Sequence, residues 1–252
     1  MDLFDLRGKV ALVTGGGSGL GHGYSVNLAK AGALVIVFGR KEGPLQKTVE
    51  EIEKAGGKAE ALTGDITDFA SIEKTVEYIV KTYGHIDILV NNAGTEIAEP
   101  LFDVTEEHFD TIISVNLKGT YMMAKEAAKY MAEQKSGKII NIASLGSYIG
   151  LQDSTVYCSS KGAVMQLTKA FAVELAKYNI QVNAIAPGYF LTEMTKPFFD
   201  DPEHGTWIKA RIPLGYVGTE NELAGIAIFL AAKASDYITG QTILVDGGWM
   251  AG

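Results

Sequence analysis

Val10-Ala-Leu-Val-Thr-Gly-Gly-Gly-Ser-Gly-Leu-Gly21 is the stretch that decides the fold of this chain, because an apolar run leads directly into a glycine-rich loop. Residues 10–13 are predicted to form a buried strand, and a helix is predicted over residues 19–31. Glycines at such a junction permit a tight turn, and they let a pyrophosphate approach backbone N–H groups at the helix N-terminus. The stretch therefore predicts a dinucleotide-binding loop.

Apolar strands and amphipathic helices alternate along the rest of the chain. This alternation predicts a single α/β domain with a Rossmann-like, doubly wound parallel sheet that helices cover on both faces. Further strands are predicted at residues 34–38, 59–63, 86–90, 138–142, 181–186 and 242–245, and further helices at 45–55, 69–83, 105–133, 155–177 and 220–231. Ligands bind such sheets beyond the carboxyl ends of the strands, where the motifs described below lie.

Length and composition indicate one globular domain over residues 1–252, because 47% of the residues are hydrophobic and no segment is biased. The net charge of −8, with scattered lysines, argues against nucleic acid as a partner. No apolar run approaches the ~20 residues of a membrane span, and the charged first residues do not resemble a signal peptide.

Cysteine and histidine usage is sparse. Cys158 is the only cysteine, so no intrachain disulfide can form, and a reducing, cytoplasmic setting is predicted. The histidines are dispersed without ligand spacing, so no metal site is predicted; they are His22, His85, His108 and His204.

Tyr157 and Lys161 are four residues apart in a predicted helix, so the ammonium can lie beside the phenol ring. A phenol has a pKa of about 10 and is a poor base at neutral pH, but an adjacent cation lowers that pKa. The Ser144 hydroxyl, at the end of the predicted strand 138–142, could hold the substrate oxygen whose proton the tyrosine exchanges. This chemistry suits hydride movement between an alcohol carbon and a nicotinamide. Most isolated Tyr-x-x-x-Lys pairs are surface residues, so the prediction depends on the whole set of motifs.

Residues 187–218 lack clean periodicity and hold four of the six prolines together with several aromatic residues. A long irregular segment at the ligand-binding edge of a sheet is often a lid or substrate loop. A small helical subdomain packed on the surface is the alternative.

The motifs follow one another in a fixed order: Thr14-Gly15-x-x-x-Gly19-x-Gly21, Asn91-Asn92-Ala93-Gly94, Asn116, Ser144, Tyr157-x-x-x-Lys161, Pro187-Gly188 and Val245-Asp246-Gly247-Gly248. Together they resemble the short-chain dehydrogenase/reductase family over essentially the whole chain. The resemblance implies an NAD(P)-dependent oxidoreductase that interconverts a secondary alcohol and a ketone. Two other classes are weighed: a non-catalytic dinucleotide sensor, which would usually have lost a catalytic residue, and a longer sugar-nucleotide epimerase or dehydratase.

By this resemblance, Tyr157 is the general acid/base, Ser144 holds the substrate oxygen, and Lys161 lowers the tyrosine pKa and binds the nicotinamide ribose. Asn116 would hold a water that links the lysine to solvent, or else be a satisfied core asparagine. Asp65 would face the adenine amino group, or cap a helix. The residues implied in cofactor binding are Gly15, Ser18, Gly19, Leu20, Gly21, Arg40, Asp65, Ile66, Asn92, Ala93, Gly94, Tyr157, Lys161, Pro187, Gly188, Phe190 and Thr192.

The end of the second predicted strand favours NADP(H) over NAD(H). An NAD-preferring site places a carboxylate there to bind the ribose 2′-hydroxyl, but this chain has Gly39 followed by Arg40 and Lys41. A guanidinium can bind a 2′-phosphate and stack on adenine. Glu42 nearby leaves NAD(H) as a second cofactor.

Two predicted helices, around residues 110–130 and 156–177, are apolar on more than one face. A helix that covers a sheet needs one apolar stripe, so the surplus predicts a partner surface. Relatives pair these helices across a two-fold axis, which implies a homo-oligomer, commonly a tetramer.

The predicted substrate is a small alcohol or ketone, and a sugar acid is favoured. The segment 183–189, Arg211-Ile212-Pro213 and the ending 245–249 resemble the gluconate and deoxy-ketogluconate dehydrogenases. Candidate substrate contacts are Glu96, Gln152, Tyr189 and Trp207. A carboxylate would need a basic partner such as Lys196, Lys209 or Arg211 turned inward.

Two other substrate classes remain alternatives. A 3-oxoacyl-[acyl-carrier-protein] reductase would need a basic patch for its acidic carrier, whereas this chain is acidic overall. A hydroxysteroid or carbonyl reductase is favoured by the aromatic residues of the segment 187–218 and by Met194.

Overall fold

One seven-stranded parallel sheet forms the centre of the molecule in the computed structural model, which describes residues 2–252. The strand order is β3-β2-β1-β4-β5-β6-β7. The strands are β1 (Val10–Thr14), β2 (Leu34–Gly39), β3 (Lys58–Thr63), β4 (Ile88–Asn91), β5 (Gly137–Ile142), β6 (Ile180–Pro187) and β7 (Thr242–Val245). The order changes direction between β1 and β4, so a crevice is expected there at the carboxyl ends of the strands.

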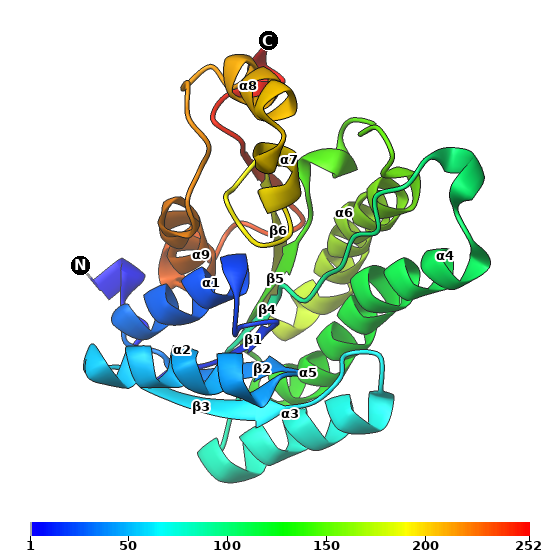
Figure 1. Cartoon of the computed structure of the whole chain (residues 1–252). Coiled ribbons are helices and arrows are strands. Elements are labelled where there is room, and N and C mark those ends of the chain that lie inside the picture. The colour runs from blue at the N-terminus through cyan, green and yellow to red at the C-terminus, as the bar shows by residue number, and fades with distance from the viewer. Residues whose placement is uncertain (1) are drawn as a thin grey trace.

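Helices lie on both faces of this sheet (Figure 1). They are α1 (Gly19–Lys30), α2 (Glu42–Lys54), α3 (Phe69–Tyr83), α4 (Glu106–Ile113), α5 (Thr120–Gln134), α6 (Thr155–Leu175), α7 (Lys196–Asp200), α8 (Pro202–Arg211) and α9 (Ala224–Ala231). Short helical turns are η1 (Asp2–Phe4), η2 (Leu101–Asp103), η3 (Ser114–Gly119), η4 (Leu145–Ser147), η5 (Ala176–Tyr178), η6 (Glu220–Leu223), η7 (Lys233–Ser235) and η8 (Trp249–Ala251).

Side-chain alternation along the strands divides the core into two layers. Ala11 and Val13 of β1 pack with α1, α2 and α9, whereas Val10 and Leu12 pack with α3, α5 and α6. All four side chains are buried, as a parallel sheet covered on both faces requires. The predicted Rossmann-like fold is confirmed.

The predicted elements all occur, and several of them differ in detail. The predicted strand 86–90 begins later, at Ile88, and the predicted helix 105–133 is divided by the π-helical turn η3. The segment 187–218 is not simply irregular, because it contains α7 and α8, as the helical alternative predicted. In Figure 1 these two helices stand above the carboxyl end of β6.

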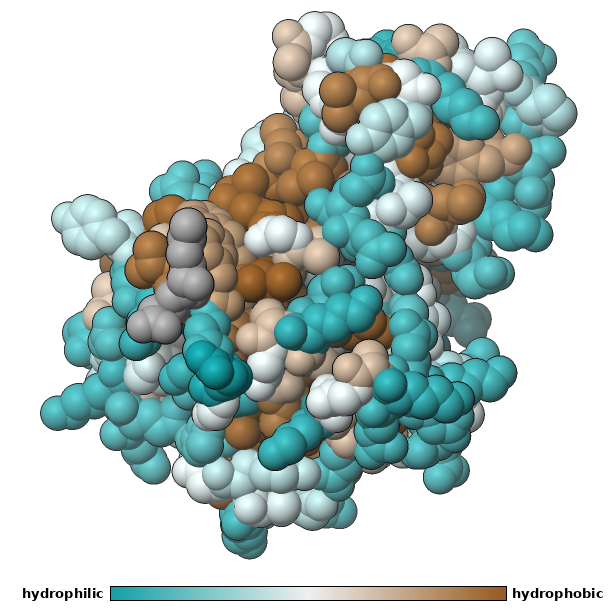
Figure 2. Space-filling model, turned by 90° about the vertical axis from the view of Figure 1, so that its left-hand side faces the viewer, coloured by the Kyte–Doolittle hydropathy of each residue, from teal (hydrophilic) through white to brown (hydrophobic). Residues whose placement is uncertain are grey.

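Apolar side chains are exposed on several surfaces of the molecule. Leu3 and Phe4 lie beside α9, where the rings of Phe4 and Phe229 are 6.4 Å apart. Figure 2 shows hydrophobic side chains gathered on this face. Tyr121 of α5 and Val173 of α6 are exposed on another part of the molecule, Val173 to 80%.

No helix within residues 2–252 combines the length and hydropathy needed to cross a membrane. The same residues contain no group of three or more His, Cys, Asp or Glu side chains that could hold a metal ion.

Candidate active site

A cleft of about 500 Å³ lies at the carboxyl ends of the strands, where the crevice was expected. Of the residues predicted to bind a cofactor, all except Gly21 line it. They are Gly15, Ser18, Gly19, Leu20, Arg40, Asp65, Ile66, Asn92, Ala93, Gly94, Tyr157, Lys161, Pro187, Gly188, Phe190 and Thr192.

The glycine loop is tied to the end of β4 by Thr14. Its hydroxyl accepts hydrogen bonds from the backbone N–H groups of Asn92 and Ala93, each at 3.0 Å. Gly15 and Gly19 have positive φ angles of 64° and 50°, which only glycine adopts readily. Gly21 was predicted to contact the cofactor but lies behind the turn, where a Cβ would be 2.1 Å from the carbonyl oxygen of Gly15. Its role is close packing of the helix against the loop.

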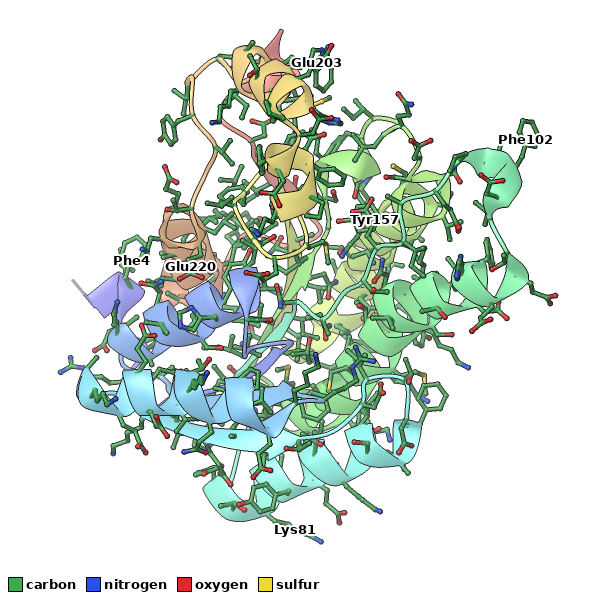
Figure 3. The ribbon with its side chains drawn as sticks, in the orientation of Figure 1. Phe4, Lys81, Phe102, Tyr157, Glu203 and Glu220 are labelled. Atoms are coloured by element: carbon green, nitrogen blue, oxygen red, sulfur yellow. The ribbon has the colours of Figure 1, made fainter. Side chains whose placement is uncertain are left out.

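Tyr157 and Lys161 project from α6 into this cleft, and Ser144 reaches it from the end of β5. Figure 3 places Tyr157 near the middle of the molecule, beneath α7 and α8. The Lys161 ammonium lies 5.8 Å from the centre of the Tyr157 ring and donates a hydrogen bond of 2.8 Å to the Ile142 carbonyl. The Ser144 side chain lies close enough to the Tyr157 hydroxyl to favour its phenolate form. The three predicted side chains are therefore brought together.

Burial controls the titration of both groups on α6. It raises the pKa of Tyr157 above its ordinary value, against the lowering effect of Ser144, and the negative charge of Glu96 raises it further. Burial lowers the pKa of Lys161 to about 8, opposed by Glu96. The predicted lowering of the tyrosine pKa is thus not seen in the protein alone, because desolvation of the phenolate outweighs the lowering effect of Ser144.

Asn116 lies directly below the cleft in the π-helical turn η3 and is fully buried. Its side-chain oxygen accepts from the backbone N–H of Thr95 at 2.8 Å, and its amide group donates to the Thr95 carbonyl and to Ser160. The side chain is therefore satisfied by protein groups and holds the loop after Gly94 in place. A π-turn interrupts regular helical hydrogen bonding and is frequent at functional sites.

Arg40 and Lys41 line the cleft where β2 ends, and Asp65 faces them after β3. Burial raises the pKa of Asp65, but hydrogen bonds from Thr67 and the charge of Arg40 lower it below its ordinary value. The alternative that Asp65 caps a helix is wrong, because Asp68 caps α3 by accepting from the Ala70 N–H.

The four predicted substrate contacts lie outside the lining of this cleft. Glu96 accepts a hydrogen bond of 2.6 Å from Ser154, and its charge acts on Tyr157, Lys161 and Tyr189. Gln152 is exposed on the loop before α6, and Trp207 is half exposed on α8.

Gly39, Lys41 and Met194, which the sequence analysis named without predicting a cofactor contact, also line the cleft. Sequence reasoning missed the other lining residues, which are Gly17, Phe38, Pro44, Leu45, Gly64, Thr95, Thr111, Val115, Ile142, Ala143, Glu193 and Thr195. Of these residues, Thr195 could have been found from the sequence, because the spacing Thr192-x-x-Thr195 is typical of a turn stabilised by side-chain hydroxyl groups. The two threonine hydroxyl groups lie 3.1 Å apart and accept each other's backbone N–H groups, which fixes the turn after Phe190.

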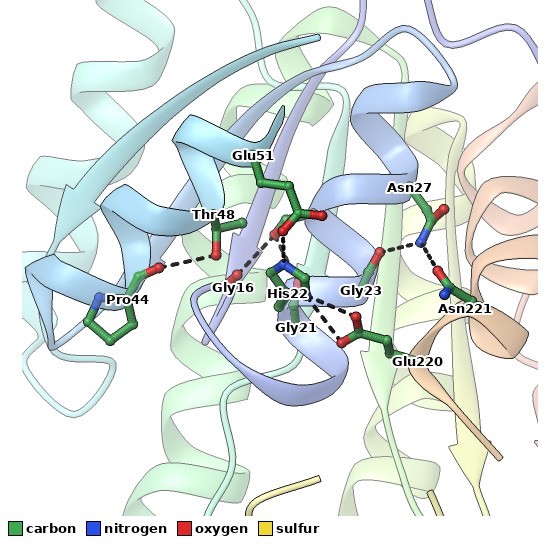
Figure 4. A network of polar contacts seen from close by, with 11 residues as sticks. Gly16, Gly21, His22, Gly23, Asn27, Pro44, Thr48, Glu51, Glu220 and Asn221 are labelled. Atoms are coloured by element: carbon green, nitrogen blue, oxygen red, sulfur yellow. Dashed lines mark hydrogen bonds and ion pairs between the residues drawn. The ribbon is translucent and has the colours of Figure 1, made fainter. Parts of the chain in front are cut away.

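A charged network braces the helix that follows the glycine loop (Figure 4). His22 of α1 contacts Glu220 of η6 at 3.1 Å through Nδ1 and Glu51 of α2 at 2.9 Å through Nε2. Burial lowers the pKa of His22, but the hydrogen bonds and charges of the two carboxylates outweigh it, so the pKa is raised. Protonated His22 therefore links three elements on one side of the loop.

His22→Gln should reduce the free energy of unfolding most at acid pH. Because the pKa of His22 is raised by folding, its stabilisation is fully present below the unfolded pKa of about 6.5 and is lost as pH rises through the folded value. Urea unfolding of both proteins at pH 6 and pH 9 measures the difference. His204→Gln, at an exposed histidine of α8, is the control, and an equal His22→Gln effect at both pH values contradicts the prediction.

Comparison with known proteins gives a consistent result over the full length. A family model described as "Enoyl-(Acyl carrier protein) reductase" matches residues 15–250. The chain is 41% identical over 249 residues to 5-keto-D-gluconate 5-reductase of Escherichia coli, covering 99% of this chain and 98% of that protein. It is 42% identical over 252 residues to 2-dehydro-3-deoxy-D-gluconate 5-dehydrogenase of Dickeya dadantii, covering 100% and 99%.

Among solved structures, a gluconate 5-dehydrogenase from Burkholderia cenocepacia in complex with NADP and tartrate superimposes with a TM-score of 0.96. It is 37% identical in sequence, and the match covers 100% of this chain and 98% of that one.

Proposed function

Because this chain belongs to the short-chain dehydrogenase/reductase family, we propose that it is an NADP(H)-preferring oxidoreductase that interconverts a hydroxyl and a keto group of a sugar acid. The observation that carries the proposal is the convergence of Ser144, Tyr157 and Lys161 on one cleft. Relatives at about 40% identity over their full length are named for gluconate and ketogluconate substrates, which supports the substrate class.

The cleft fits a dinucleotide. The positive φ angles of Gly15 and Gly19 shape a loop at the N-terminus of α1, where backbone N–H groups suit a pyrophosphate. Arg40 and Lys41 supply cations where a 2′-phosphate would lie, and Asp65 stands after β3 as an acceptor. Bound NADP(H) would supply the hydride.

The protein's residues position the substrate and move the proton. Ser144 binds the substrate oxygen, and Tyr157 donates a proton to it in reduction or accepts one in oxidation. Lys161, held by the Ile142 carbonyl, provides the positive charge that favours the phenolate during oxidation. Asn116 fixes the loop beside Lys161, since its amide binds both backbone groups of Thr95. The proposal also includes a water, held by Asn116 as the family resemblance implies, that links Lys161 to solvent.

Steady-state kinetics tests the substrate class. D-gluconate with NADP⁺ and 5-keto-D-gluconate with NADPH should give turnover, and kcat/KM should exceed that for a hydroxysteroid, a bulky ketone or an acyl thioester. If the sugar acids fail while a steroid or bulky ketone is converted, the sugar-acid assignment is wrong and only the reaction type is retained. Turnover of an acyl thioester alone would favour a carrier-protein substrate.

We also propose that the protein is a homo-oligomer, most simply a tetramer. Much of the predicted apolar surplus is internal, since Ile112, Met123 and Val164 are buried. Tyr121 and Val173 remain exposed, however, and the face over α9 adds Leu3 and Phe4. Sedimentation equilibrium at micromolar concentration tests this proposal, and a monomer mass would contradict it. The single cysteine supports a cytoplasmic location, which is likewise a proposal.

A further inference from the structure

Arg211 is held at the end of α8 by two indole rings. Its guanidinium carbon lies 5.6 Å from the centre of the Trp207 ring and 5.1 Å from that of Trp249. The two rings are 5.8 Å apart and nearly perpendicular, at 75°. Contacts with two aromatic rings restrict a long side chain and leave the edge of the guanidinium available for hydrogen bonds.

This cation has no carboxylate partner among residues 2–252, although the chain carries 30 acidic residues against 22 basic ones. No ion pair or hydrogen bond joins Arg211 to any of them. Lys196, another basic candidate in this segment, lies 3.6 Å from Asp200 and is already paired. Arg211 is therefore a positioned cation with free donors.

The position of Arg211 relates it to the reacting groups. Trp249 packs 4.9 Å from Tyr189, which follows the cleft residue Gly188. The positive charge of Arg211 acts on Tyr189, and so does the negative charge of Glu96. Ile208 and Ile212, on either side of Arg211, pack in one cluster with Leu145, the residue after Ser144.

The charges around the catalytic side chains are therefore divided between two elements. Glu96, on the loop after β4, carries negative charge beside Tyr157 and Lys161. Arg211 carries positive charge on α8. An anionic substrate would be repelled by Glu96 and attracted by Arg211. The two charges would therefore orient the substrate before it contacts Ser144.

We infer that Arg211, stacked against Trp207 and Trp249, binds the carboxylate of the sugar acid and so determines both the preference for an anionic substrate and its direction in the cleft. The inference rests on the proposed function. A guanidinium binds a carboxylate through two parallel charge-assisted hydrogen bonds, which no neutral group reproduces.

The test uses two probes that differ only in charge, D-gluconate and D-gluconamide, with NADP⁺ in both cases. Arg211→Gln should lower kcat/KM for gluconate by about ten-fold or more, mainly through KM, because a charge-assisted bond is lost. Turnover of gluconamide should change by less than about three-fold. Arg211→Lys keeps the charge without the planar guanidinium, so its kcat/KM for gluconate should lie between those of the wild type and Arg211→Gln.

Lys233→Gln, at an exposed lysine of η7, is the control and should leave kcat/KM for both probes unchanged. An equal loss for gluconate and gluconamide in Arg211→Gln would overturn the inference, since it would indicate a structural role. An unchanged KM for gluconate would overturn it as well. Failure of the wild-type protein to turn over either probe would instead refute the proposed function.

Binding can also be followed without turnover, because Trp207 and Trp249 are the only two tryptophans of the chain and both contact Arg211. Titration of the wild-type protein with gluconate should change its intrinsic fluorescence, and the apparent Kd should rise about ten-fold in Arg211→Gln. An equal Kd in the two proteins would count against the carboxylate contact.

Discussion

Tyr157→Phe should abolish nearly all turnover while leaving the fold and cofactor binding intact. The substitution removes only the hydroxyl that is proposed to exchange the proton, while the half-buried ring beside Lys161 remains. Positioned proton transfer contributes about 10²- to 10⁴-fold to a rate, so a loss of kcat in this range is expected.

Kinetics with a sugar acid measures the loss of turnover, and fluorescence titration with NADPH measures whether cofactor binding is retained. Tyr237→Phe is the matched control, because this tyrosine is fully exposed and should give wild-type rates. If Tyr157→Phe kept activity within ten-fold of the wild type, Tyr157 would not be the acid/base.

Arg40→Ala should lower kcat/KM for NADPH by about 10- to 100-fold and leave that for NADH nearly unchanged. The guanidinium lines the cleft directly after Gly39, and Gly39 stands where an NAD-preferring site would carry a carboxylate. Hydrogen bonds to a charged group contribute about 1.5–3 kcal/mol, which sets the expected size.

The wild-type protein tests the same point, since it should prefer NADPH over NADH. Lys54→Ala, at an exposed position in the last turn of α2, is the control and should change kcat/KM for neither NADPH nor NADH. A clear wild-type preference for NADH, or an equal loss with both cofactors in Arg40→Ala, would contradict a 2′-phosphate contact.

Local patterns predicted most of the fold because several physical signals agreed at each boundary. The helix at residues 69–83 was predicted to its last residue: its apolar stripe ends at Gly84, whose φ of 85° closes the helix in the left-handed conformation. The convergence of Ser144, Tyr157 and Lys161 on one cleft could be predicted because their motifs follow a strand end or lie on one helix face, while their proposed roles came from the family resemblance.

Features that depend on contacts between residues far apart in the chain could not be predicted from the sequence. The π-turn around Asn116 has no signature in hydrophobic periodicity, since its side chain is satisfied by Thr95 and Ser160 from other segments. The helices at residues 196–211 were not predicted from periodicity, because their apolar residues pack in a small separate cluster with Trp249, Leu145 and Leu244. Gly21 lies outside the cleft lining, which could not be foreseen because a packing glycine and a lining glycine look the same in sequence.

The sheet order has a consequence for the way the chain acquires its structure during synthesis. The central strand β1 pairs on one side with β2 and on the other with β4, where Ala11 meets Ile88. Parallel neighbours so far apart in sequence raise the contact order, which slows folding. A ribosome-bound chain that ends before residue 88 would leave one edge of β1 open, so this apolar strand would need protection from aggregation until β4 emerged.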